Sequence, residues 1–159
     1  MYYVDNDRNA KKFYADGSAR RIVEERRVYE GEPILEFYPQ SYQEELPLED
    51  GSVDLLISQY AGLVSAGCKR YLRTGGCLIA NNSHGDAGFA ACDPEFRLVA
   101  VVNRRGEQWT LSTRDLADYF IPKSQTLPTD PSALADHIRE LGKGIGYTRT
   151  ATDYVFEKR

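Results

Sequence analysis

The chain has 159 residues, of which 42% are hydrophobic and 28% are charged, with a formal net charge of −4. Such a composition is typical of one folded domain, and we predict a single domain over residues 1–159. The acidic balance argues against a nucleic-acid partner, because proteins that bind nucleic-acid phosphates present a basic face. No apolar run approaches the ~20 residues that cross a bilayer, so we expect no membrane partner either.

Cysteine usage and the start of the chain indicate the compartment. The three cysteines, Cys68, Cys77 and Cys92, have no Cys-x-x-Cys spacing, which is typical of reduced thiols rather than of a disulfide framework. The chain has only two histidines and no clustered cysteines, so we predict no metal site. No signal-peptide pattern opens the sequence, and we expect a cytoplasmic protein.

In chain order, the first predicted element is a strand over residues 1–4, which ends at the polar run Asp5–Asp7. Either acid of that run can cap the helix that follows. Asp16–Ser18 interrupts this helix, after which the apolar stripe resumes. A turn that contains proline then leads to a second predicted strand over residues 34–38.

The middle of the chain carries the strongest pattern. Val53–Ser58 and Cys77–Ala80 have the uninterrupted apolar centres that suit strands covered on both faces. Between them, apolar residues recur at helical spacing over 63–72. Thr74–Gly76 is predicted to stop that helix, since glycine tolerates the left-handed conformation at a helix end. A right-handed crossover makes the two strands parallel neighbours.

The second half continues with strands and helices. The predicted elements are a polar loop over 81–88, a hairpin of strands over 98–102 and 108–111, a short helix over 113–120, a helix over 131–141 and a closing strand over 150–157. The Gly-x-Gly-x-Gly segment Gly142–Gly146 follows a helix, whereas a nucleotide-binding loop has to leave a strand and open a helix. We therefore interpret it as a helix stop followed by a loop.

Several segments resemble class I S-adenosylmethionine-dependent methyltransferases, in particular the type 11-like members. Glu44–Pro47 followed by Asp50–Asp54 is similar to the segment that joins the family's third and fourth strands. Tyr71–Gly76 is similar to the turn before the fifth strand, and Asp153–Phe156 to the last, antiparallel strand. The resemblance runs from about Val4 to the end of the chain. It implies an α/β fold with a Rossmann-like methyltransferase sheet, mostly parallel with a C-terminal antiparallel strand.

The family's first strand and its glycine-rich turn, which bind the methionine end of the cofactor, have no counterpart in this sequence. The resemblance therefore implies an N-terminally truncated sheet. That first strand lies between the second and fourth in the family, so its loss leaves two inner strand edges unpaired. Three explanations stay open: the chain is a fragment of a longer enzyme, a second copy or a partner chain completes the sheet, or the remaining strands have closed up into a smaller, non-catalytic domain.

Four residues align with the part of the family's site that binds adenosine. The resemblance places Asp5 at the end of the second strand, where an acid accepts hydrogen bonds from both ribose hydroxyls. Helix capping is the alternative role for the same acid. Ser41, Tyr42 and Gln43 align with the adenine-contacting position, and Tyr42 takes the place of the usual acid. A tyrosine there can stack on adenine, and its neighbours can bond the amino group.

Further residues align with the methionine and substrate side. Ser58 and Gln59 follow the fourth strand, where family members contact methionine or substrate. A simple strand-to-helix turn is the alternative. His84 lies in the polar loop after the fifth strand, where a histidine can act as general base for a hydroxyl or amine acceptor. A loop histidine without a chemical role is the alternative.

An aromatic group lies between the last two predicted strands and includes Trp109, Tyr119, Phe120 and Tyr147. Insertions at this point of the family's fold often cover the substrate. These residues are therefore either core side chains or a lid over a small organic acceptor.

The resemblance leads to two functional hypotheses. The first is an S-adenosylmethionine-dependent methyltransferase that acts on a small molecule and is present as a fragment or otherwise incomplete form. The alternative is a non-catalytic methyltransferase-like domain that acts through protein–protein association. Whether the chain is catalytically active stays open. Because the glycine-rich turn is missing, we expect this chain alone to bind S-adenosylmethionine weakly or not at all.

Overall fold

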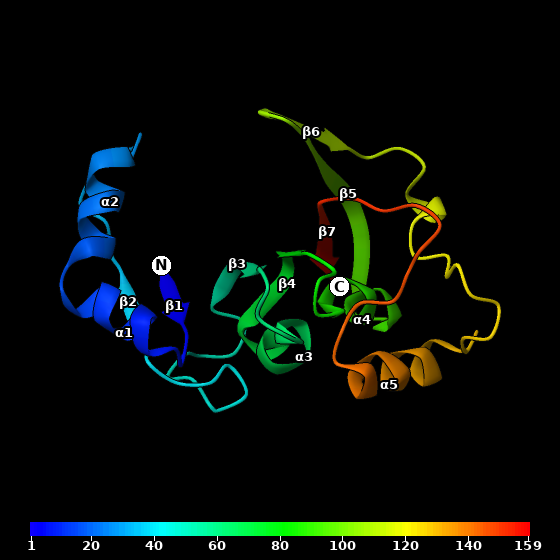
Figure 1. Cartoon of the computed structure of the whole chain (residues 1–159). Helices are drawn as coiled ribbons and strands as arrows, with labels where there is room; N and C mark the ends of the chain where they lie inside the picture. The colour runs from blue at the N-terminus through cyan, green and yellow to red at the C-terminus, as the bar shows by residue number, and fades with distance from the viewer. The chain divides into compact units, whose positions relative to one another are not determined.

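The computed structural model describes all of residues 1–159 and shows an α/β chain with seven strands and five α-helices (Figure 1). The chain divides into two compact units, Met1–Pro47 and Leu48–Arg159. We call them unit 1 and unit 2 and describe each by itself. The assignment of residues 1–159 to one methyltransferase-like domain stays a prediction.

Unit 1 holds a two-stranded parallel sheet and two helices. Its elements are β1 (Tyr2–Val4), α1 (Arg8–Ala15), α2 (Ser18–Arg26) and β2 (Glu36–Tyr38). The side chain of Asp7 caps α1 by accepting hydrogen bonds from the backbone N–H groups of Asn9 and Ala10 at 2.7 and 3.2 Å. Gly17 separates the two helices with a φ of 78°, a left-handed conformation that glycine adopts without strain. The predicted interruption of the helix is confirmed.

Aromatic stacking holds unit 1 together. The rings of Tyr14 on α1 and Phe37 on β2 are stacked, with centroids 4.3 Å apart and planes within 4°. The Tyr3 ring lies 5.1 Å from the same Tyr14 ring. Burial, with the nearby Tyr3 and Asp5 adding to it, raises the pKa of Tyr14 to about 12. The helix is therefore attached to the small sheet by ring contacts rather than by a deep aliphatic core.

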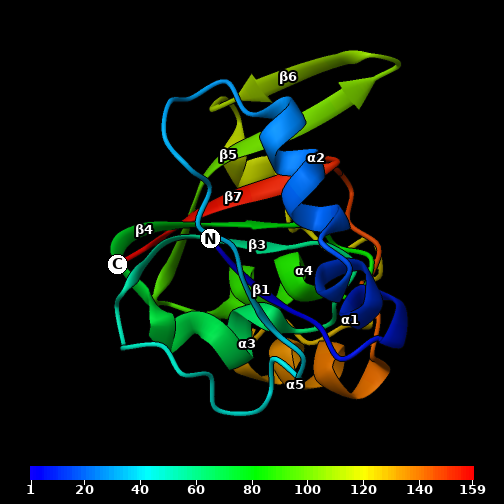
Figure 2. The same cartoon turned by 90° about the vertical axis from the view of Figure 1, so that its left-hand side faces the viewer.

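Unit 2 contains the larger sheet and three helices. Its elements are β3 (Val53–Ser58), α3 (Val64–Cys68), a 3₁₀ turn (Lys69–Tyr71), β4 (Leu72–Ala80), α4 (Asp86–Cys92), β5 (Phe96–Arg105), β6 (Gln108–Ser112), a second 3₁₀ turn (Leu116–Asp118), α5 (Pro131–Leu141) and β7 (Asp153–Lys158). The strand order is β3-β4-β7-β5-β6. Figure 2 shows β7, in red, between β4 and β5.

Two sequence predictions about this sheet are confirmed. β3 and β4 are parallel neighbours, as the apolar runs and the crossover indicated. The last strand, β7, is antiparallel to β4 and to β5. The prediction of a mostly parallel sheet is wrong, because three of the four strand pairs are antiparallel. The physical reason is the position of β7: it reverses direction between β4 and β5, and the β5–β6 hairpin adds another antiparallel pair.

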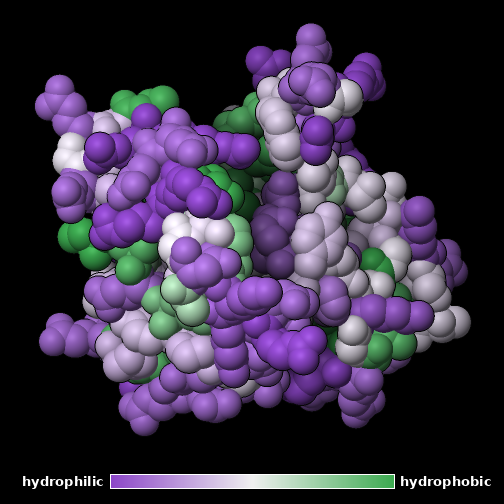
Figure 3. Space-filling model, turned by 60° about the vertical axis from the view of Figure 1, so that its left-hand side comes forward, coloured by the Kyte–Doolittle hydropathy of each residue, from purple (hydrophilic) through white to green (hydrophobic).

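The strands of the chain form two sheets, one in each unit. β3 stands at the edge of the five-stranded sheet and exposes 46% of Leu55 and 57% of Ile57. In the space-filling view, hydrophilic residues cover most of the visible surface, with apolar areas among them (Figure 3).

The crossover helix is shorter than the sequence indicates. Helical spacing over 63–72 predicts a helix that Thr74–Gly76 stops, but α3 ends at Cys68 and β4 begins at Leu72. The glycine pair lies inside β4, where the pairing with β3 is irregular between Leu72 and Cys77. Leu72 is fully buried in its strand, so burial of an apolar strand residue outweighed the helical pattern.

The core of unit 2 lies between the sheet and its helices, which occupy one face of the sheet (Figures 1 and 2). Leu78 on β4 and Phe156 on β7 are paired neighbours and almost fully buried. A second apolar cluster between α4 and α5 includes Phe89, Ile138 and Tyr147. The start of α5 is as predicted, with Asp130 as the cap and Pro131 as the first helical residue. α4 was not predicted, since its sequence lies partly in the polar run expected to be a loop.

Candidate functional site

Each unit places polar residues at the carboxyl end of a parallel strand pair. β1 and β2 form that pair in unit 1, and β3 and β4 in unit 2. In open α/β sheets, ligands bind at the carboxyl ends of the strands, because loops and helix starts there present polar groups. Each unit therefore carries its own candidate site.

In unit 1, Asp5 directly follows β1, and its backbone N–H donates to the Tyr38 carbonyl at the end of β2 at 3.3 Å. One carboxylate oxygen of Asp5 accepts a hydrogen bond from the Asp7 N–H at 2.8 Å. The helix cap itself is Asp7, so the capping role that the sequence left open belongs to Asp7. Asp5 is exposed and its second oxygen makes no hydrogen bond in the structure.

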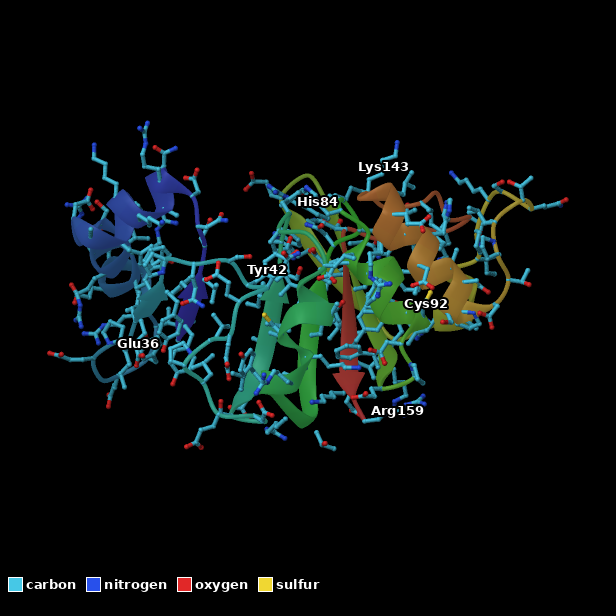
Figure 4. The ribbon with its side chains drawn as sticks, turned by 90° about the horizontal axis from the view of Figure 1, so that it is seen from below. Glu36, Tyr42, His84, Cys92, Lys143 and Arg159 are labelled. Atoms are coloured by element: carbon cyan, nitrogen blue, oxygen red, sulfur yellow. The ribbon has the colours of Figure 1, made fainter.

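The other predicted adenosine contacts, Ser41, Tyr42 and Gln43, lie in the turn that follows β2. The Ser41 hydroxyl accepts a hydrogen bond from the Gln43 N–H at 3.2 Å, and the Ser41 carbonyl accepts one from the Glu44 N–H at 3.0 Å. Figure 4 shows Tyr42 away from Glu36, the first residue of β2. Because β1 and β2 run in the same direction, this turn and Asp5 occupy the same edge of the small sheet.

In unit 2, a chain of hydrogen bonds joins three sheet ends. Gln59 follows β3, and its Nε2 donates to Oδ1 of Asp153, the first residue of β7, at 2.8 Å. Asn81 follows β4, and its Nδ2 donates to Oε1 of Gln59 at 2.9 Å. The Ser83 hydroxyl donates to Oδ1 of Asn81 at 2.7 Å and lies 3.1 Å from Nδ1 of His84. The chain thus runs from a buried carboxylate to an exposed imidazole.

The donors and acceptors in these hydrogen bonds favour one tautomer of the His84 imidazole. Oδ1 of Asp153 accepts from Gln59, so each amide along the chain turns its N–H₂ toward Asp153 and its oxygen toward His84. The single hydroxyl proton of Ser83 then points to Asn81, and the hydroxyl oxygen accepts from Nδ1–H of His84. In the neutral imidazole this leaves Nε2 as an unprotonated acceptor. In that tautomer, the exposed His84 side chain presents Nε2 as a hydrogen-bond acceptor at the carboxyl edge of the sheet.

Ser58 takes part in a different contact, below that edge. It is buried and hydrogen-bonds the carboxylate of Asp86, which also accepts from the backbone N–H of Ser65 at 3.0 Å. Burial raises the pKa of Asp86, while these hydrogen bonds oppose the rise. Asp86 thus ties the end of β3 to the start of α3, and Ser58 faces the covered side of the sheet.

The glycine segment Gly142–Gly146 supports the His84 loop. The Gly144 N–H donates to the Ser83 carbonyl at 3.4 Å, and Nδ2 of Asn82 donates to the Ile145 carbonyl at 3.3 Å. A Cβ atom on Gly144 would lie 2.0 Å from the Asn82 carbonyl oxygen, so only glycine fits there. Figure 4 shows His84 and Lys143, which belong to these two adjoining segments. The interpretation of the segment as a helix stop and loop is confirmed, with Gly142 as the cap of α5.

The structure thus brings Gln59 and His84 into one network and keeps Ser58 out of it. Sequence reasoning missed Asn81 and Asp153 as members of the site. The signal for Asn81 was available, because amides directly after a buried strand are placed at its carboxyl edge. Asp153 gave no such signal, since its role depends on where β7 pairs.

No family model, curated protein or solved structure matches this chain. None of its helices is both long and apolar enough to cross a membrane. No group of three or more His, Cys, Asp or Glu side chains is placed to hold a metal ion. What the site can do has to be inferred from its own geometry.

Proposed function

We propose that this chain is a class I S-adenosylmethionine-dependent methyltransferase-like protein that acts on a small molecule, built on a truncated Rossmann-like sheet. The observation that carries the proposal is the hydrogen-bond chain from Asp153 to His84 at the carboxyl ends of β3 and β4. The parallel pairing of β3 and β4 and the antiparallel β7 beside β4 support it, because the resemblance implies both.

The residues present fit only one end of the cofactor. The unengaged oxygen of Asp5 suits a ribose hydroxyl, and Tyr42 offers a ring for adenine, with Ser41 and Gln43 as polar neighbours. For the methionine end, the sequence offers no Gly-x-Gly-x-Gly turn that leaves a strand and opens a helix. The one Gly-x-Gly-x-Gly segment follows α5 and packs on Asn82. We therefore expect weak cofactor binding by this chain alone, and completion by a further segment or a partner in the active form.

S-adenosylmethionine, when bound, supplies a sulfonium methyl group that a nucleophilic oxygen or nitrogen can take. His84 would accept the proton that the methyl acceptor loses, through its free Nε2. Gln59 and Asn81 would hold the imidazole in the tautomer that can do so. General-base assistance of this kind is worth roughly 10²–10⁴-fold in rate, and positioning of the acceptor contributes the remainder.

Calorimetric titration of this chain with adenosine and with S-adenosylhomocysteine tests the proposal. We expect both to bind, with similar dissociation constants in roughly the sub-millimolar range, because losing two or three polar contacts at ~1–1.5 kcal/mol each weakens a micromolar site about 100-fold. Asp5→Ala should abolish binding of both. Asp7→Asn is the matched control and should bind as the wild type does, since asparagine also caps helices.

Two results would contradict this proposal. Micromolar affinity for S-adenosylhomocysteine would show that the missing turn is unimportant. Unchanged adenosine binding in Asp5→Ala would remove the ribose assignment.

A second function is favoured by one specific observation, the edge position of β3. An edge strand presents unpaired backbone N–H and carbonyl groups that can pair with another chain. Leu55 and Ile57 on this strand are about half exposed, so apolar surface lies next to the free edge. A non-catalytic role through association with a second copy or a partner chain would use this strand.

A further inference from the structure

A pocket of about 440 Å³ lies on the helix-covered side of unit 2. Its walls come from α4, the start of α5 and the segment around residues 120–129. The hydrogen-bond chain that ends at His84 lies instead at the carboxyl ends of β3 and β4. The pocket is therefore separate from the proposed methyl-transfer site.

Tyr147 provides the one unusual polar group in this wall. Its side chain is 1% exposed, and its hydroxyl is buried without any hydrogen-bond partner. Leaving a buried hydroxyl unpaired costs roughly 1–3 kcal/mol in folding free energy, so a structure keeps such a group only where something else compensates. Burial, with the neighbouring Cys92 adding to it, raises the pKa of Tyr147 well above its usual range. The phenol therefore stays neutral and able to donate.

The hydroxyl of Tyr147 lies against the pocket wall at Gly88. A Cβ atom on Gly88 would lie 2.4 Å from the hydroxyl oxygen, so the glycine makes room for it. Both residues line the pocket. Because the hydroxyl is sealed from solvent, a ligand in the pocket contacts it only when residues of the pocket wall move outward. Pro122 forms a β-bridge with Tyr147, and residues 123–129 of the wall have no helix or strand.

The other walls restrict the chemistry of a ligand. None of the residues that line the pocket is charged, and the apolar ones include Phe120, Leu127 and Leu134. An ionised ligand would lose its hydration there without gaining a partner. The thiol of Cys92 also lines the pocket, and burial raises its pKa, so it contributes a wall rather than a nucleophile. The volume lies within the usual range of about 300–1,000 Å³ for small-molecule sites.

We propose that this pocket binds an uncharged, mostly apolar small molecule that carries one hydrogen-bond acceptor, and that the Tyr147 hydroxyl donates to that acceptor. A ring ketone has this chemistry: its carbonyl accepts one hydrogen bond, and its ring fills the apolar space. The proposal does not rest on the methyltransferase function, and it involves no covalent step.

Binding of 1-tetralone, compared with tetralin, tests this on the full chain. The two probes share a ring skeleton, and only the ketone carries an acceptor. We expect 1-tetralone to bind with a dissociation constant of about 0.1–1 mM and to shift the backbone amide signals of Gly88 and Leu134 in ¹H–¹⁵N spectra. Tetralin should bind about 5- to 10-fold more weakly, the factor for one hydrogen bond.

Three variants make the test specific. Tyr147→Phe should remove the preference for the ketone and leave tetralin binding unchanged. Tyr119→Phe is the matched control, because Tyr119 is a buried tyrosine of the same unit that does not line the pocket, and it should keep the preference. Leu127→Trp should block both probes by filling the pocket. Failure of both probes to bind, equal affinities in the wild type, or a preference that survives Tyr147→Phe would each overturn the proposal.

Discussion

Unit 1 and unit 2 both carry polar residues at the carboxyl end of a parallel strand pair, but they differ in what supports those residues. Unit 2 has a five-stranded sheet with fully buried residues such as Leu78 and Ile138. Unit 1 has two three-residue strands, and its only buried residues are Ala19, Pro33 and Leu46. An isolated two-stranded sheet is marginal in water. The proposed catalytic residues of unit 2 therefore rest on a core of their own, and the proposed adenosine contacts of unit 1 do not.

The largest expected effect comes from separating the two units. Residues 48–159 alone should unfold cooperatively, because the core of unit 2 lies entirely within them. Residues 1–47 alone should show no cooperative transition, because they bury too little apolar surface to offset their chain entropy. Circular dichroism during thermal unfolding of each piece is the measurement. A cooperative transition in the shorter piece would contradict the comparison.

Truncating one apolar side chain in each unit compares how much buried packing contributes to the stability of the two units. Leu78→Ala should lower the free energy of unfolding by about 3–5 kcal/mol, since it leaves a cavity at a fully buried position. Phe37→Ala removes the ring that stacks on Tyr14 and should cost only about 1–2 kcal/mol. Denaturant unfolding followed by circular dichroism reports both values. Equal losses would mean that unit 1 is packed as tightly as unit 2.

The edge of β3 offers a test of association. If the free edge pairs with another copy, light scattering at micromolar concentration should show a dimer or larger species. The double variant Leu55→Lys, Ile57→Lys should shift it to a monomer, because charges protect edge strands from pairing. Leu141→Lys is the control, since Leu141 is exposed to a similar degree on α5. A wild-type monomer at all concentrations would count against the association hypothesis.

The smallest expected effect is a loss of stability of unit 1 at alkaline pH. The pKa of Tyr14 is about 12 in the folded chain, against about 10 for an unfolded tyrosine. Between these values only the folded state keeps the proton, so the stabilisation is complete below pH ~10 and is lost as the pH rises toward ~12. The Tyr14→Phe variant should lack this pH-dependent part of the stability. Tyrosinate absorbance, followed against pH in the wild type and in Tyr14→Phe, checks the raised pKa of Tyr14, and the absence of a group that titrates near pH 12 in the wild type would remove the assignment.

Much of the local structure could be predicted from the sequence because its causes are local. The proline after Asp130 starts α5 and the glycine at position 142 ends it through backbone preferences of single residues. The parallel crossover from β3 to β4 follows from apolar runs joined by a right-handed connection. Of the site, the resemblance to the methyltransferase family indicated Gln59 directly after β3 and His84 in the loop after β4.

Two predictions were wrong because the structure at these points depends on residues far apart in the sequence. The glycine pair in Thr74–Gly76 has the local pattern of a helix stop, yet burial of Leu72 draws this stretch into β4. The parallel character of the sheet depends on where β7 inserts, which no local pattern specifies.

By itself, the sequence determined the caps of α5, the β3–β4 crossover and the presence of a polar loop with a histidine after β4, because neighbouring residues decide such features. Only the tertiary structure decided that His84 belongs to a hydrogen-bond chain ending at Asp153. The link between Gln59 and Asp153 joins residues 94 positions apart, and it forms because β7 starts at the edge where β3 and β4 end. The strand order determines which residues so far apart become hydrogen-bond partners, and the packing of the whole sheet determines the strand order.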